Sequence, residues 1–360
     1  MTPGRPPDHT VLRPAALLLL AAAVVRPLAA QSATPALVPV VLPAPLRRFD
    51  FRPGSIAWLS DSTVALIDMS ASQVVVADLR HGTMTRHGRE GSGPGEFRMP
   101  IMSFADANGG LVVDDIGARR LTQFDARHAF VRQARSPGPT LRIVGWRGDT
   151  VRVVWVTFQP GGGPTVSDVD LTTGQATTRY RLFERDSSIV APSPDIPSAP
   201  GLVAVASGVR GGLVAGSPET YRLAAFDSAG RSVRRFGRPG LKAVFRTEAE
   251  LDDEIRPMRR QMPPDALRDA RARLSKQPKP YFSLAGVEVD GSGRVWVATT
   301  RGGSRTDVDV FAPEGKFIGT VMMADHVTTF AFRLPYVAVL TERQQGDDQG
   351  AFGLDLYRVR

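Results

Sequence analysis

Cysteine is absent from this chain of 360 residues, and asparagine occurs only once, as Asn108. Without cysteine the protein has no disulfide bonds, no thiolate metal ligands, no thiol nucleophile and no lipid attached through an N-terminal cysteine. Lysine is also scarce, so that arginine accounts for almost all of the basic side chains and for a formal net charge of +9. The arginines are scattered along the chain rather than gathered in one stripe, and we therefore expect no nucleic-acid partner.

Long hydrophobic runs are also missing beyond the N-terminus. The main apolar run is residues 14–25 (PAALLLLAAAVV), which follows Arg5 and Arg13 and precedes the small residues of LAA at 28–30. This order is typical of a secretory signal peptide, and the run is shorter than the ~20 residues that span a bilayer. We expect residues 1–30 to be removed. The remaining protein is then expected to have no transmembrane segment and to be located in the periplasm or the extracellular space.

The rest of the chain repeats a pattern of short apolar strands. After a Pro/Ala-rich leader at 31–45, residues 46–360 repeat a strand, a polar or glycine turn, a Val-rich strand, a loop, and a third strand with a tight turn. The third strand and its turn appear as VVVADLRHG (74–82), LTQFDARHA (121–129), VSDVDLTTG (166–174), LAAFDSAG (223–230) and VDVFAPEG (308–315). Without the additions at 187–200 and 241–280, each unit is roughly 45 residues long, the length of a propeller blade.

The last unit lacks its outermost strand, and a segment within residues 38–51 is expected to replace it. Six units of about four strands each are typical of a β-propeller. The sequence therefore predicts an all-β fold, a six-bladed β-propeller with an N-terminal closing strand and a short helical insertion between blades four and five.

The stretch GREGSGPGEFRMP at 88–100 has the glycine content of a phosphate-binding loop. Pro94 removes one backbone N–H, however, no Lys-Ser/Thr pair follows, and the next expected element is a strand rather than a helix. We assign the glycines to a tight crossing between blades. Phe97 and Met99 are expected to fill the gap between the blades, and Pro100 to begin the next strand.

Together with VDGSGRVWV at 289–297, this loop resembles bacterial six-bladed β-propellers of the NHL-repeat-like kind. The resemblance implies an exported propeller and no particular activity, because the fold hosts binders, scaffolds and enzymes alike. Propeller enzymes of the gluconolactonase type also resemble this fold, and they hold a divalent metal with carboxylates and asparagines near the axis. One asparagine in a surface turn cannot provide that set.

Residues 241–280 interrupt the β pattern at the crossing between blades four and five. Thr247 and Glu250 form a capping box, after which apolar residues recur at helical spacing. A second helix is expected to begin near Pro264 and to end before Pro278. The sequence leaves open whether the insertion is a lid over the central channel or packs against the side of blades four and five.

Catalytic motifs are weak in this sequence. His81 and His128 occupy matching turns on the face opposite the crossings, whereas His87 and His326 are expected toward the crossing face, in adjacent blades. Neighbouring acids such as Asp114 and Asp115 point to opposite sides of a strand, and a GxSxG elbow is absent. We assign no catalytic residue, no metal site and no cofactor.

The sequence favours an exported, monomeric, non-catalytic binding propeller that recognises a protein, peptide or glycan on the face of the inter-blade loops. The candidate contacts are His87, Arg89, Glu90, Arg119, Arg120, Arg301, Arg305 and His326. Grouped arginines at the mouth of a channel would favour an anionic partner. The alternative is a metal-dependent hydrolase or lactonase with a site made of carboxylates.

Overall fold

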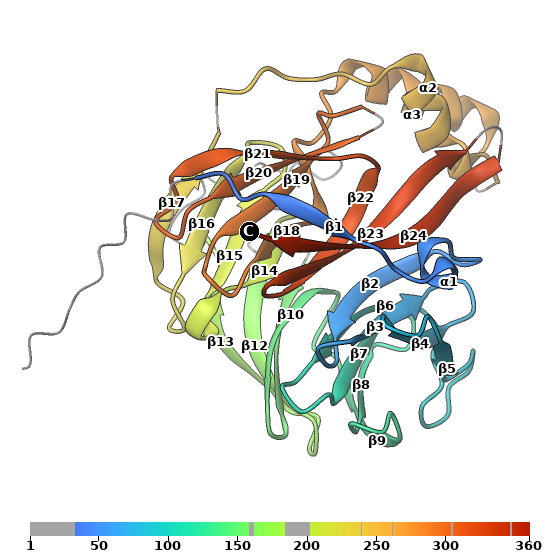
Figure 1. Ribbon diagram of the computed structural model, residues 1–360, viewed down its shortest axis with the longest axis vertical. Helices are drawn as coiled ribbons and strands as arrows, with labels where there is room; N and C mark the ends of the chain where they lie inside the picture. Colours follow the sequence, from blue (N-terminus) through green and yellow to red (C-terminus); the bar gives the residue numbers. More distant parts are fainter. Residues whose placement is uncertain are drawn as a thin grey trace, which may run out of the picture. The chain divides into compact units, whose positions relative to one another are not determined.

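The computed structural model describes residues 33–157, 162–183, 202–238, 240–260, 262–303, 305–345 and 348–360. The expected signal peptide at 1–30 and the Ser/Pro-rich addition at 187–200 lie outside these ranges. The described residues form six four-stranded sheets in one compact unit, Ala33–Arg360 (Figure 1). The predicted six-bladed β-propeller is confirmed.

The first three blades contain twelve strands in chain order. Blade one is β2 (Pro53–Trp58), β3 (Thr63–Asp68), β4 (Gln73–Asp78) and β5 (Met84–His87). Blade two is β6 (Pro100–Ala105), β7 (Leu111–Asp115), β8 (Arg120–Phe124) and β9 (Phe130–Arg135). Blade three is β10 (Thr140–Arg147), β11 (Thr150–Val156), β12 (Pro164–Asp170) and β13 (Ala176–Arg181).

The last three blades follow the same scheme, except that blade six takes one strand from the N-terminus. Blade four is β14 (Ala204–Ser207), β15 (Leu213–Ser217), β16 (Arg222–Phe226) and β17 (Ser232–Gly237), with the short 3-10 helix η2 (Val209–Gly211) after its first strand. Blade five is β18 (Phe282–Val289), β19 (Val295–Thr299), β20 (Thr306–Phe311) and β21 (Phe317–Met323). Blade six is β22 (His326–Arg333), β23 (Tyr336–Gln345), β24 (Asp348–Val359) and β1 (Leu37–Val40).

The hydrophobic core is divided among the six blade junctions. The second strand of a blade packs on both sides against neighbouring blades, so β7 and β19 are buried at every residue. Buried side chains form six clusters, one for each pair of adjacent blades. Burial on both faces explains the apolar runs LVV in β7 and VWVA in β19.

The ring closes through β1, which pairs antiparallel with β24 from Leu37 opposite Val359 to Val40 opposite Leu356. Figure 1 shows the two strands side by side, although they come from opposite ends of the chain. The predicted N-terminal closing strand is confirmed, and it lies within the segment expected as a leader. The short helix α1 (Ala44–Arg47) then leads into blade one.

The first strands of neighbouring blades contact one another around the centre. The strands of each blade are antiparallel and follow one another in chain order, so the chain alternates between the two faces of the ring. The loops between blades therefore lie on the same face as the turns between second and third strands. We call this the crossing face. The turns between first and second strands, and between third and fourth strands, lie on the other face, which we call the turn face.

The glycine-rich crossing at 88–100 behaves as predicted in most respects. Gly88 and Gly95 have positive φ angles of 82° and 72°, Phe97 is completely buried between blades one and two, and Pro100 begins β6. Met99, however, is 48% exposed and does not fill the gap. Its backbone N–H donates to the carboxylate of Asp115 of β7 at 2.9 Å.

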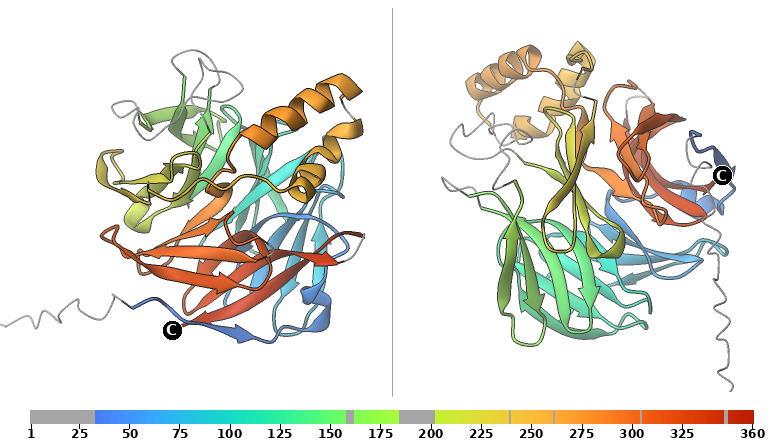
Figure 2. Two further views of the ribbon diagram at one scale, coloured as in Figure 1. Left: turned by 90° about the horizontal axis from the view of Figure 1, so that it is seen from above. Right: turned by 90° about the vertical axis from the view of Figure 1, so that its left-hand side faces the viewer.

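The predicted helical insertion is confirmed. It consists of α2 (Glu248–Ile255), the 3-10 helix η3 (Pro257–Arg260) and α3 (Pro264–Lys276). The capping box of Thr247 and Glu250 is present. Both views of Figure 2 show the two α-helices outside the stack of strands. Among the described residues, no helix is long and apolar enough to cross a membrane.

Candidate functional site

The helical insertion stands on two chain segments that pair with each other at the crossing face. The backbone N–H of Lys279 donates to the carbonyl of Val244 at 2.7 Å, and Phe245 forms a β-bridge with Pro278. On the returning segment, the hydroxyl of Tyr281 donates to the carbonyl of Leu241 at 2.9 Å. These contacts close the base of the insertion as a hairpin.

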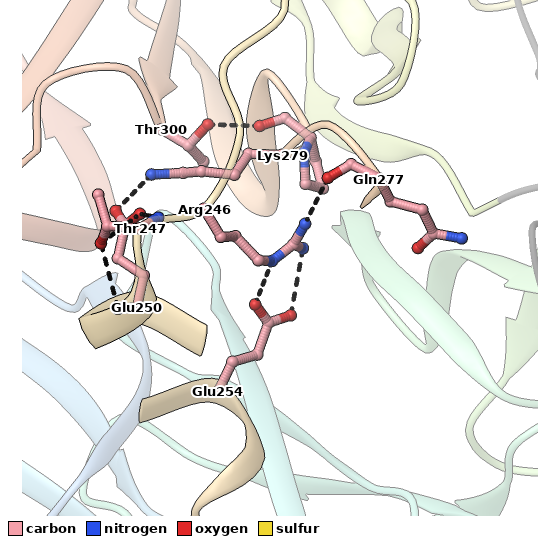
Figure 3. Close-up of polar contacts among 8 residues, drawn as sticks. Arg246, Thr247, Glu250, Glu254, Gln277, Lys279 and Thr300 are labelled. Atoms are coloured by element: carbon pink, nitrogen blue, oxygen red, sulfur yellow. Dashed lines mark hydrogen bonds and ion pairs between the residues drawn. The ribbon is translucent and has the colours of Figure 1, made fainter. Parts of the chain in front are cut away.

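Charged side chains then fix the helices to this base (Figure 3). The guanidinium of Arg246 donates through two N–H groups to the carboxylate of Glu254 and through a third to the carbonyl of Gln277 at 3.2 Å. The ammonium of Lys279 lies 2.6 Å from the carboxylate of Glu250, which also caps α2. The side chain of Arg246 is only 8% exposed, whereas that of its partner Glu254 is 40% exposed.

The helices themselves pack mainly on each other rather than on the strands. Leu251 and Ile255 of α2 and Ala270 of α3 are buried. Arg271 of α3 binds two carboxylates of α2, those of Glu248 and Asp252. The insertion is therefore a small, internally packed projection on a fixed base, which we call the α2–α3 projection.

A buried carboxylate organises the blades beneath the projection. Asp309 of β20 is completely buried. It accepts hydrogen bonds from the hydroxyls of Tyr221 and Thr320, each at 2.6 Å, and pairs with Arg301 at 2.7 Å and Arg238 at 3.1 Å. Burial raises the pKa of Tyr221 well above its ordinary value, which keeps its phenol protonated as a donor. The cluster joins blades four and five where the insertion begins.

Three of the arginines predicted as partner contacts are occupied by interactions within the protein. Arg301 belongs to the Asp309 cluster. Arg120 is 8% exposed, and it donates to the carbonyls of Ser92 and Glu96 in the glycine-rich crossing. Arg89 binds the carboxylate of Glu96 in the same loop at 2.7 Å. The side chains of Arg120 and Arg301 therefore hold loops in place.

The other predicted contacts are spread over separate blades. Glu90, Arg119, Arg305 and His326 are exposed, and Arg119 occupies a turn position with a φ of 54°. His87 lies against His128 of blade two, with 5.1 Å between the ring centres, and it has no contact with His326 in the described part of the chain. The structure does not bring the eight predicted residues together in one patch.

An ion pair crosses the centre of the ring. Arg142 of β10 in blade three pairs with Glu288 of β18 in blade five, although blade four stands between them in the chain. Their side chains are 25% and 10% exposed. Burial lowers the pKa of Arg142 to about 10, so the guanidinium is still charged at neutral pH. The carboxylate of Glu288 is therefore engaged within the protein.

A pocket opens on the turn face between blades six and one. Its volume is about 640 Å³, within the range of roughly 300–1,000 Å³ that is usual for small-molecule sites. Trp58, Leu42 and Leu79 form apolar walls, and Arg80 and Arg333 lie at its polar part. Arg333 also pairs with Asp61 at 2.7 Å.

The sequence does not predict this pocket, because the pocket depends on how the closing segment at 40–43 passes blade one. The sequence also does not predict the Arg142–Glu288 pair, whose members are 146 positions apart. No signal in a single sequence links them. Within the described residues, no group of three or more His, Asp or Glu side chains is placed to hold a metal ion.

Solved structures with a similar fold include two proteins of Bacteroides species. A DUF4221 family member from Bacteroides vulgatus matches with a TM-score of 0.55 and 10% identity over 92% of this chain and 99% of that one. A protein of Bacteroides fragilis assigned as exported matches with a TM-score of 0.51 and 12% identity over 91% and 95%. No family model and no curated protein sequence matches the chain. At these identities the likeness shows the fold alone.

Proposed function

We propose that this chain is an exported, non-catalytic propeller that binds a protein, peptide or glycan on its crossing face, with the α2–α3 projection as the main contact element. The observation that carries the proposal is the hydrogen-bonded base of the projection, where Arg246 and Lys279 bind the carboxylates of Glu254 and Glu250 in α2 (Figure 3). A binding element that is already ordered loses little conformational freedom when a partner binds.

The exposed face of the projection is rich in charge. Arg268, Asp269 and Lys276 of α3 are exposed, and Ala272 between them leaves room for a partner. Such a surface suits a polar macromolecular partner better than an apolar small molecule. Export follows from the signal-peptide pattern of residues 1–30, and we propose that the protein acts as a monomer in the periplasm or outside the cell.

Photo-crosslinking in the producing cell tests this proposal. A benzophenone amino acid is introduced at Ala272 on the projection, and at Ser228 on the turn face of blade four as a matched exposed control. We expect one discrete adduct from position 272 and none from position 228. Equal adduct patterns from both positions, or none from position 272, would contradict the proposal.

A second candidate function is favoured by the pocket between blades six and one. Its apolar walls and the arginines at its polar part fit an amphipathic anion, such as a molecule with an aromatic or aliphatic body and one acidic group. Among the described residues no carboxylate pairs with Arg80, so this guanidinium is available to the acidic group. Leu334, 40% exposed, lies at the same pocket.

Binding of anilinonaphthalene sulfonate, an aromatic anion, tests the second candidate. We expect saturable fluorescence enhancement that Leu334→Asp weakens at least about tenfold, because it places a negative charge at the apolar part of a site for an anion. Val209→Asp is the control, because Val209 is a 50% exposed apolar residue near the corresponding turn of blade four. Equal effects of the two substitutions, or enhancement that does not saturate, would rule out a specific pocket.

A further inference from the structure

His128 has a positive φ angle, and glycine occupies the equivalent position in the turns of blades four and five. The turns between third and fourth strands in blades two, four and five form the same pair of backbone hydrogen bonds. Their left-handed residue is His128 in blade two, with a φ of 62°, but Gly230 and Gly315 in the other two, at 81° and 84°. This position follows a type I turn and usually takes glycine. Strain of this kind is often found at functional positions.

The same turn packs against the outer strand of the preceding blade. A Cβ atom on Gly230 would lie 2.3 Å from the ring of Tyr180, and one on Gly315 would lie 2.7 Å from Arg234. At the junction of blades one and two, the ring of His128 lies against the ring of His87, the last residue of β5. The ring centres are 5.1 Å apart and the planes are inclined by 58°. His128 thus occupies the position that is glycine in blades four and five, and its ring contacts His87 from the outer strand of blade one.

Both imidazoles are half-buried, and neither ring has a hydrogen bond to another residue in the described ranges. Burial lowers the pKa of His87, and burial together with the neighbouring ring lowers that of His128. The carboxylate of Asp125, in the same turn, raises the pKa of His128 and so partly opposes these two effects. The lowered pKa values favour the neutral form of both rings, and the neutral imidazole is the form that binds metals.

We propose that His87 and His128 form a two-histidine binding site for a divalent transition-metal ion such as Zn²⁺ or Ni²⁺. Two imidazoles bound to one tetrahedral zinc, with Zn–N distances of ~2.0–2.1 Å, have their ring centres roughly 5 Å apart. Imidazole nitrogen suits these ions, whereas Ca²⁺ and Mg²⁺ prefer oxygen ligands. The remaining coordination positions are open to water or to a donor from another molecule.

A bound ion would link the outer strand of blade one to the adjacent turn of blade two. It would therefore stabilise the folded state in proportion to its occupancy, because the unfolded chain does not hold the two histidines together. The site uses neither the α2–α3 projection nor the pocket, and its test is independent of both proposed functions.

Isothermal titration of the tag-free full-length chain with ZnCl₂ and with NiCl₂ at pH 7.5 tests the site. We expect one site per chain, and an affinity that falls at least about tenfold in His87→Ala and in His128→Gly. The His128→Gly variant is a favourable one for folding, because glycine suits the positive φ angle at this position. His81→Ala and His326→Ala remove exposed histidines and serve as matched controls that leave the affinity unchanged.

Circular dichroism and the Tm of each metal-free variant confirm that it is folded. Loss of binding in folded His128→Gly, together with binding at full strength in the two controls, would support the site. Wild-type affinity in both His87→Ala and His128→Gly would overturn it, as would an equal loss in the control variants.

Discussion

Arg142 of blade three and Glu288 of blade five form an ion pair across the centre of the propeller, past the short first strand of blade four. The pair is inside the ring, where Glu288 is only 10% exposed. An acidic residue at this place could serve a metal or a substrate if it were free. Here its charge is balanced by an arginine from another blade, and the pair holds two non-adjacent blades together.

Removal of one partner of this pair should destabilise the fold. We expect Glu288→Ala to lower the free energy of unfolding by about 2–4 kcal/mol, because the guanidinium of Arg142 is left partly buried without its carboxylate. Urea denaturation followed by tryptophan fluorescence measures the change. The double variant Arg142→Met/Glu288→Leu should recover most of the loss, and failure of the single substitution to destabilise would show that the pair is solvated.

Asp114 should make stability depend on pH. Its carboxylate is completely buried. Burial raises its pKa to about 7, against the lowering effect of the Thr140 hydroxyl and with a further contribution from Asp115. Because the folded-state pKa lies above the unfolded value near 4, the folded state binds more protons between the two values. This contribution to stability is therefore present at low pH and is lost as pH rises toward 7.

The matched variant is Asp114→Asn, which is nearly isosteric and does not ionise. At each pH we compare the Tm of the variant with that of the wild type. We expect the variant's advantage in Tm to be several degrees larger at pH 8 than at pH 5, because only the wild type holds a buried charge at pH 8. Comparison of the two proteins at each pH cancels the contribution of the histidines. A Tm difference that is the same at pH 5 and pH 8 would mean that Asp114 keeps its ordinary pKa.

The Asp309 cluster should make Arg301 important for stability. We expect Arg301→Ala to cost about 2–3 kcal/mol, and Tyr221→Phe about 1.5 kcal/mol, since Asp309 keeps three of its four partners in each variant. Arg305→Ala is the control for Arg301, because its ion pair with Asp307 spans 3.7 Å and its side chain is 55% exposed. Equal effects of Arg301→Ala and Arg305→Ala in chemical denaturation would contradict the assignment.

The attachment of α2 and α3 to the base of the projection should depend on Arg246. In Arg246→Ala, we expect the amides of α2 and α3 to exchange hydrogen at least about tenfold faster, with little change in the strands, since the helices pack mainly on each other. Hydrogen exchange with mass spectrometry measures both regions. Arg268→Ala, which removes an exposed pair with Asp265, should leave the exchange unchanged, and slow exchange in Arg246→Ala would show that the base does not hold the helices.

The repeat could be predicted from the sequence because most blades contain the same kind of local turn, which an aspartate stabilises. Asp78, Asp125, Asp170 and Asp227 anchor the repeat, and in the structure each carboxylate accepts backbone N–H groups of the turn that follows. The capping box of Thr247 and Glu250 is equally local. Such signals depend on a few neighbouring residues, and a single sequence is enough to show them.

The His87–His128 pair and the buried position of Arg301 could not be predicted from the sequence, because they depend on contacts between residues far apart in the chain. His81 and His128 match in sequence, but the turn of blade one is one residue longer, so that Gly82 rather than His81 takes the positive φ. The position of His87 against His128 depends on how adjacent blades pack. The burial of Arg301 likewise depends on Asp309, which the sequence places on an ordinary strand. Side-chain pairing between blades requires the three-dimensional structure.

The most direct test of the proposed function is replacement of residues 248–276 by a short Gly/Ser linker, which the paired segments at Val244 and Lys279 can close. The partner captured from position 272 is purified, and its affinity for the wild type and for the shortened chain is measured by surface plasmon resonance. We expect the shortened chain to stay folded, by circular dichroism, and to bind at least about tenfold more weakly. Unchanged affinity in a folded shortened chain would contradict the role of the α2–α3 projection.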